Sequence, residues 1–158
     1  MRLLLCNGII FLQVLAVLQA EANSQYFDIP VWPGAEESCP APGNIRYNGG
    51  VYRSPAKSDG VDWTGVLPNE GSATVVAFEK AVFVLTEKNS ETRGFLSSCI
   101  YATSQGRYLN MRLDAGDKYD EVMWVVKSSS WNKSPSFSSQ AILECTNKHE
   151  RACVFFLK

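Results

Sequence analysis

The residue types that catalyse acid–base or nucleophilic reactions are present in this chain, but their spacing does not predict a catalytic centre. His149 is the only histidine, and it lies in the charged run 146–151, where we expect an exposed turn without a wall to exclude water. The stretch 128–140 is rich in serine but contains no G-x-S-x-G nucleophile elbow. A Ser-His-Asp arrangement is therefore not expected.

Four acidic residues gather around Gly116, and they are the one feature that could support a hydrolase. They are Asp114, Asp117, Asp120 and Glu121. Their spacing differs from that of a calcium loop, in which alternate positions turn their oxygens onto one ion. We expect a solvated loop between strands, and we keep a small exported hydrolase that uses these acids as an alternative.

Aromatic residues are the better indication of a binding surface. Trp131 and Phe137 lie in the polar stretch 128–140, and loops often carry binding residues because a rigid scaffold presents them to solvent. Large apolar side chains on loops also fold back as plugs of the core. We predict Trp131 and Phe137 as ligand-binding residues, with a protein or a glycan as the partner.

The chain opens with the pattern of an export signal. Met1 and Arg2 precede a mainly apolar run that ends on Ala20-Glu21-Ala22, the order of a positive region, an apolar region and a small-residue cleavage site. Polar and flexible residues interrupt the run, so a membrane anchor is a poorer interpretation. We predict a signal peptide over residues 1–22, cleaved after Ala22 or alternatively after Ala20, no transmembrane span after processing, and a secreted or periplasmic location.

Four cysteines remain after the predicted cleavage, and an even number in an exported chain indicates disulfides. Cys145 and Cys153 flank a polar stretch between two apolar runs, so they can face each other across a hairpin. We favour this pair among the three possible pairings, which leaves Cys39 with Cys99. The spacing does not match zinc knuckles, so we expect no metal and no cofactor.

Charge and length exclude further classes. The chain has 15 basic and 16 acidic residues among 158, for a net charge of −1. No basic field exists to attract nucleic acid, so we expect no nucleic-acid partner. The length after processing suits a single domain, and nothing in the sequence specifies an oligomeric state.

The pattern along the chain predicts a mainly β protein. Prolines and glycines make residues 23–44 an irregular N-terminal arm, and residues 45–158 form the β domain. Asn48-Gly49 between two β-rich runs marks a hairpin. Strand patterns follow at the ranges 61–67, 73–86 with a break at Glu79-Lys80, 95–103, 107–113, 121–127, 141–145 and 153–157. We predict a single antiparallel β-sandwich or small barrel of about eight strands, stapled by disulfides.

Short motifs of this chain are similar to those of a known family. They are Cys39-Pro40, the run 45–50 with Tyr52, Trp63-Thr64-Gly65, the run 78–83, Cys99-Ile100-Tyr101 and the strand 109–113. The chain resembles a family of small secreted or periplasmic bacterial proteins catalogued as a domain of unknown function. The resemblance implies the Cys39–Cys99 pairing and implies no activity.

These observations favour a non-enzymatic binding or interaction module of the cell envelope or the extracellular space, with the stretch 128–140 as its contact surface. The alternatives are the exported hydrolase described above and an inhibitor or immunity-type protein with one tight macromolecular partner.

Overall fold

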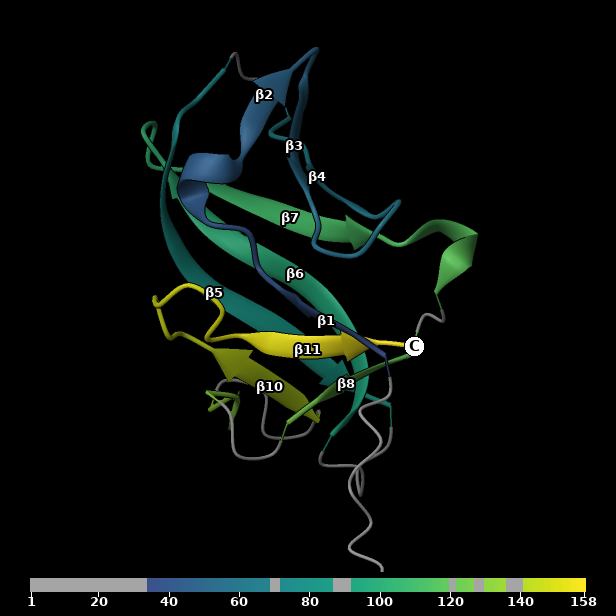
Figure 1. Cartoon of the computed structure of the whole chain (residues 1–158). Coiled ribbons are helices and arrows are strands. Elements are labelled where there is room, and N and C mark those ends of the chain that lie inside the picture. The colour runs from purple at the N-terminus through teal and green to yellow at the C-terminus, as the bar shows by residue number, and fades with distance from the viewer. Residues whose placement is uncertain (1–33, 69–71, 87–91, 120–121, 127–129, 136–140) are drawn as a thin grey trace, which may run out of the picture. The chain divides into compact units, whose positions relative to one another are not determined.

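Eleven strands make one antiparallel sheet that curls around its own core (Figure 1). A computed structural model of the chain describes residues 34–68, 72–86, 92–119, 122–126, 130–135 and 141–158, all in one compact unit. The strands are β1 (Ala35–Ser38), β2 (Arg46–Asn48), β3 (Val51–Pro55), β4 (Asp62–Gly65), β5 (Val75–Leu85), β6 (Arg93–Thr103), β7 (Tyr108–Asp114), β8 (Met123–Val125), β9 (Asn132–Lys133), β10 (Ile142–Cys145) and β11 (Val154–Leu157). Two short 3-10 turns, Pro42–Asn44 and Gly116–Lys118, complete the described elements. This confirms the predicted antiparallel β domain.

The long strand β6 organises the sheet. One of its edges pairs with β5 along nearly the whole strand, and β5 continues to β10 and β9. Its other edge is shared, because β7 pairs with residues 99–102 and β8 pairs with residues 93–94. Two arms of the sheet therefore leave the same edge, β7-β4-β3-β2 and β8-β11-β1.

Register shifts bend the sheet where the sequence predicts a break. The β5–β6 pairing shifts at Val75/Ala77, at Phe78/Lys80 and at Val82/Phe83. Each shift adds local twist to an antiparallel pair, so an 11-residue strand can wrap around the core. The polar pair Glu79-Lys80 thus marks a bulge within one strand and not a boundary between two.

The predicted hairpin at Asn48-Gly49 is present. The strands β2 and β3 pair from Arg46↔Arg53 to Asn48↔Val51, and Gly49 and Gly50 have φ values of 58° and 89°. A primed turn requires positive φ at both central residues, which glycine adopts without strain.

The ends of the described chain lie side by side. Strand β1 pairs with β11 from Ala35↔Leu157 to Ser38↔Val154, although the sequence predicts an irregular arm over residues 23–44. A Cβ atom on Gly34 would lie 1.4 Å from the Leu157 carbonyl oxygen, so this close approach requires glycine. The predicted signal peptide, residues 1–22, lies outside the described residues.

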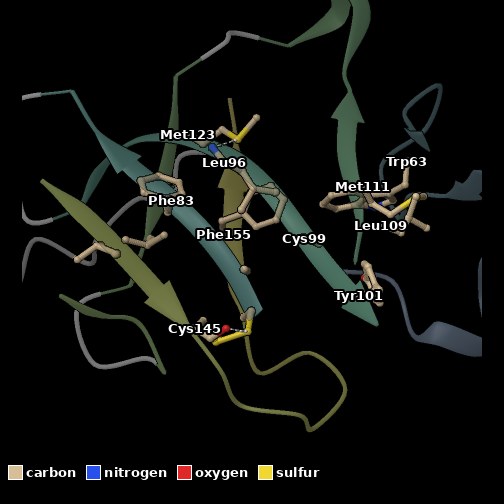
Figure 2. Packing of buried hydrophobic residues seen from close by; sticks show 14 of the residues in the cluster. Trp63, Phe83, Leu96, Cys99, Tyr101, Leu109, Met111, Met123, Cys145 and Phe155 are labelled. Carbon is tan, nitrogen blue, oxygen red and sulfur yellow. Dashed lines mark hydrogen bonds between the residues drawn. A yellow bond between two sulfur atoms is a disulfide. The ribbon is translucent and has the colours of Figure 1, made fainter. Parts of the chain in front are cut away.

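The core fills the inner face of the curled sheet (Figure 2). Large side chains with essentially no exposed surface dominate it: Tyr52, Trp63, Phe83, Tyr101, Leu109, Met111, Phe155 and Leu157. The rings of Trp63 and Phe155 meet edge to face at 6.2 Å between centroids, an arrangement that aromatic pairs prefer. Among the described residues, none belongs to a helix long and apolar enough to cross a membrane.

Both predicted disulfides are present, but the second one does not join a hairpin. Cys39 bonds to Cys99 and Cys145 bonds to Cys153, with Cα separations of 5.8 and 5.7 Å. In the described part of the chain, β10 pairs with β5 and β9, whereas β11 pairs with β8 and β1. The expectation of a hairpin at residues 141–157 was wrong, because a disulfide requires only two adjacent Cα atoms and no hydrogen-bonded ladder.

Candidate functional site

A pocket of about 270 Å³ lies between two segments of the chain that are each attached to a disulfide. We call residues 37–44 the N-terminal wall and residues 147–153 the loop wall. The end of β3 supplies Ser54 and Pro55, the turn after it supplies Lys57, and the rings of Trp63 and Phe78 add to the lining. The volume is near the lower end of the roughly 300–1,000 Å³ range of small-molecule sites.

The N-terminal wall is anchored by a buried carboxylate. Glu37 is 1% exposed, and its Oε2 accepts hydrogen bonds from the backbone N–H groups of Lys57 at 3.0 Å and Ser58 at 3.1 Å. Its Oε1 accepts from the N–H of Ser38 at 3.2 Å and from that of Lys57 at 3.3 Å. A buried carboxylate requires such donors to offset its lost hydration, so Glu37 holds β1 against the turn that follows β3.

Two further contacts fix the same wall to the sheet. The disulfide to Cys99 joins Cys39 to the centre of β6, and the Tyr101 hydroxyl donates a hydrogen bond of 2.6 Å to the carbonyl oxygen of Pro40. Burial of the Tyr101 ring raises the pKa of its hydroxyl well above the usual value of 10.0. The phenol is therefore protonated at neutral pH, as a donor must be.

The loop wall is organised mainly by bonds within itself. The His149 N–H donates to Asn147 Oδ1 and the Ala152 N–H donates to the His149 carbonyl, both at 3.1 Å. Arg151 has a φ of 64°, a left-handed conformation that is uncommon outside glycine. The loop wall is joined to neighbouring segments by the disulfide from Cys153 to Cys145 and by a hydrogen bond from Asn147 Nδ2 to Ser130 Oγ at 3.1 Å.

Cations border the pocket. Lys57, Lys148 and Arg151 line it together with two acids, Glu37 and Glu150. Lys57 is paired with Glu36 at 2.8 Å. The pKa of Glu36 is lowered, first by its hydrogen bond from Lys57; burial opposes this effect, and the charges of Lys57 and Arg151 add smaller lowering effects. The charge of Arg151 therefore acts on Glu36, the residue that precedes the N-terminal wall.

One buried hydroxyl in the lining has no hydrogen-bond partner among the described residues. Ser54 is 2% exposed, and its Oγ forms no hydrogen bond to any described residue. A buried hydroxyl without a partner costs about 1–3 kcal/mol, and such a group calls for a specific explanation. Ser58 Oγ is also unpartnered, but Ser58 does not line the pocket.

Of the two residues predicted to bind a ligand, Trp131 does not line the pocket. Trp131 is 7% exposed, with its ring 5.7 Å from that of Phe83 and its Nε1 donating to the Val154 carbonyl at 2.8 Å. It is a plug of the core, so its ring is not presented to a partner. Phe137 lies outside the described residues.

The predicted acidic cluster is only partly described. Asp114 and Asp117 are exposed, and Asp114 Oδ1 accepts a hydrogen bond of 3.4 Å from the Gly116 N–H. Asp120 and Glu121 lie outside the described residues. Over the ranges that the structure describes, no group of three or more histidine, cysteine or acidic side chains could hold a metal ion.

Sequence reasoning missed the pocket. Glu37 and Ser54 become its polar lining only because β1 pairs with β11 and because Ser54 faces inward on β3. The exposed loop histidine, His149, was identified correctly as part of a turn, but its place on the rim of a pocket was not expected.

The sequence family agrees with this architecture. A model described as "Protein of unknown function (DUF3757)" matches residues 34–156. The chain belongs to this family. The match spans both disulfides, both pocket walls and nearly all of the curled sheet, and it confirms the resemblance inferred from the short motifs. No curated protein and no solved structure matches the chain.

Proposed function

We propose that this member of the family is a non-enzymatic binding module that acts in an oxidising compartment, secreted or periplasmic, and that its ligand enters the pocket between the N-terminal wall and the loop wall. Two disulfides are usual in proteins outside the cytosol, which supports the compartment. The observation that carries the site is the unpartnered Oγ of Ser54, buried in the lining of a pocket bordered by cations.

The ligand class follows from the lining. Ser54 Oγ can donate or accept one hydrogen bond, and Lys148 and Arg151 on the loop wall favour a negative group at the rim. Pro40, Pro42 and Phe78 offer apolar surface between these polar groups. A small organic carboxylate, such as an acidic sugar or the C-terminus of a short peptide, fits this combination.

The test is thermal unfolding of the oxidised protein against matched ligand pairs: galacturonate with its methyl ester, and acetylated dipeptides with their C-terminal amides. A ligand at 100 times its Kd adds about 2.7 kcal/mol to stability, and that is several degrees in Tm for a domain of this size. We expect shifts with the acids and smaller ones with the neutral partners.

Two serine variants provide a matched comparison. Both Ser54→Ala and Ser58→Ala remove a buried hydroxyl that has no partner, so their stabilities change alike, but only Ser54 faces the pocket. Ser54→Ala is expected to weaken binding about three- to tenfold, the value of one hydrogen bond, and Ser58→Ala to leave it unchanged. Equal effects of the two variants, or no shift with any acid, would refute the proposal.

The other functions considered from the sequence have less support. Asp114 ends strand β7 and Asp117 lies in the 3-10 turn Gly116–Lys118, and both are exposed, so no wall excludes water from either carboxylate as acid–base catalysis requires. An inhibitor with one tight protein partner remains an alternative that predicts no shift with small acids and a large shift with that partner.

A further inference from the structure

The outer face of the sheet carries three arginines that the strand registers place in one line. Arg46 on β2 lies opposite Arg53 on β3, Arg53 lies opposite Thr64 on β4, and Thr64 lies opposite Arg112 on β7. We call these four positions the arginine row. Paired residues of an antiparallel sheet point to the same face, so the four side chains share one surface.

The burial pattern shows that this is the outer, solvent-exposed face of the sheet. The three arginines are exposed and Thr64 is partly exposed, whereas their chain neighbours Tyr52, Trp63 and Met111 are buried in the core. With strands about 4.8 Å apart, the row extends roughly 14 Å from β2 to β7. Three positive groups thus follow a line that crosses four strands.

No described residue forms an ion pair with the row, although Asp62 and Asp114 occupy the adjacent row on the same face. Neither Arg53 nor Arg112 has an ion pair with any described residue. Arg46 donates through Nη1 to the carbonyl oxygens of Gly43 and Ile45, which orient its guanidinium without cancelling its charge. Like charges directly opposite each other destabilise a sheet. An external anion between Arg46 and Arg53 would therefore reduce their mutual repulsion.

The side chains in the two adjacent rows of the same face indicate in which direction along the sheet a bound ligand extends. On one side Asp62 lies opposite Asp114, and this pair repels an anion. On the other side β7 continues outward with Asn110 and then Tyr108, which is 63% exposed. An anionic ligand on the arginine row therefore extends toward Asn110 and Tyr108 and away from the two aspartates.

We propose that this face, the arginine row with Asn110 and Tyr108, binds an anionic polysaccharide. Guanidinium groups bind carboxylates and sulfates through two parallel hydrogen bonds. Asn110 offers an amide to hydroxyl groups, and the exposed ring of Tyr108 offers an apolar face on which a sugar ring packs. A repeating chain of acidic sugars combines all three chemistries.

Other anionic macromolecules fit the face less well. Nucleic acid binding draws on many phosphate contacts, whereas this row has three cations on a chain of net charge −1. Binding to a bilayer surface requires large apolar side chains beside the cations, whereas the apolar neighbours of Arg53 on the same face of β3 are the smaller Val51 and Pro55. The proposal is independent of the pocket, which opens on the inner side of the sheet where Ser54 and Trp63 lie.

The experiment measures the affinity of the oxidised protein for polygalacturonate, which carries carboxylates, and for heparin, which carries sulfates. Neutral dextran, a single-stranded oligonucleotide and vesicles with anionic lipid are the comparison probes. We expect binding to at least one of the acidic polysaccharides, a lower affinity for every other probe, and a marked loss of affinity between about 50 and 200 mM salt.

Variants on the row complete the test. Arg53→Gln and Arg112→Gln should each weaken polysaccharide binding about five- to tenfold, since each removes a charge-assisted contact. Tyr108→Ala should weaken it by a smaller factor and without changing the salt dependence. Lys133→Gln removes the same charge from the exposed strand β9, at the other end of the sheet, and should leave the affinity unchanged.

The two proposals can fail separately. Ser54→Ala is expected to leave polysaccharide binding intact, and Arg53→Gln to leave binding of small carboxylates intact. No binding to either acidic polysaccharide, equal binding to dextran, or a preference for the oligonucleotide or the vesicles would overturn the assignment. An equal loss in Lys133→Gln and Arg53→Gln would reduce the effect to overall charge and would also overturn it.

Discussion

The N-terminal wall and the loop wall of the pocket are held in different ways. The N-terminal wall is fixed by contacts to distant parts of the sequence: the ladder between β1 and β11, the Glu37 carboxylate and the disulfide of Cys39 to Cys99, 60 residues away. The loop wall is closed by a disulfide across 8 residues and hydrogen bonds mainly to itself. One wall is therefore part of the fold, whereas the other is a local structure attached to it.

Because of this difference, we expect changes in the N-terminal wall to affect mainly stability and changes in the loop wall to affect mainly ligand binding. A change in the N-terminal wall affects contacts that also hold the sheet together, so its consequences are global. A change in the loop wall affects the charges and the shape of the pocket rim with little effect on the core. The loop wall is thus the place where the choice of ligand can vary while the fold stays the same.

The largest effect is expected from the long-range disulfide. Replacing Cys39 and Cys99 together by serine opens a loop of 60 residues, and the chain-entropy model gives a loss of about 4 kcal/mol. Chemical denaturation of the double variant measures this loss. If this variant loses less stability than a variant in which Cys145 and Cys153 are both replaced by serine, the contrast between the two walls is contradicted.

The loop disulfide is expected to matter less for stability and more for binding. Replacing Cys145 and Cys153 together by serine opens a loop of 8 residues, for which the same model gives about 2.5 kcal/mol. Because the loop wall then loses its conformation, affinity for small carboxylates should fall while the core stays folded. Near-ultraviolet circular dichroism monitors the core, and titration of the ligand monitors the pocket.

Within the N-terminal wall, the buried Glu37 carboxylate is expected to contribute more to stability than the exposed Glu36 carboxylate beside it. In Glu37→Gln one oxygen becomes an N–H donor that faces the backbone N–H groups of the turn, so we expect a loss of about 2 kcal/mol. Glu36→Gln is the matched control, because the neighbouring side chain is exposed and paired only at the surface. Equal losses in the two variants would mean that burial of Glu37 contributes nothing.

The smallest effect concerns Tyr101. Tyr101→Phe removes the hydrogen bond to the Pro40 carbonyl and should lose about 1 kcal/mol at neutral pH. Since burial raises the pKa of the folded-state hydroxyl above 10.0, stability is retained below that pH and falls as the pH rises above it. Stability of the wild type should therefore decline above about pH 10 more steeply than that of Tyr101→Phe, which urea denaturation at several pH values measures.

Local patterns predicted much of the fold, because they act over a few residues. Asn48-Gly49 specified a hairpin, the pattern of residues 107–113 specified a strand, and the even cysteine count indicated two disulfides. The predicted break at Glu79-Lys80 became a bulge, since a polar pair alone does not distinguish a turn from an irregularity in a continuous ladder.

The candidate sites were less predictable, because they depend on residues brought together from distant parts of the chain. Trp131 looked exposed from its serine-rich neighbours, yet Phe83 and the Val154 carbonyl give it a buried position. Glu37 has no local signal of burial, and the arginine row is visible only when the registers of four strands are known. Composition likewise hides the row, because its charge is balanced by acids elsewhere in the chain.

The pairing of β1 with β11 has a consequence for the order of events during synthesis. The first described strand, β1, pairs with the last described strand, β11, so the sheet stays open until Val154–Leu157 have been made. Contacts between such distant segments also form slowly, because a long loop must be closed first. A chain with this connectivity therefore cannot complete its sheet from its N-terminal part alone.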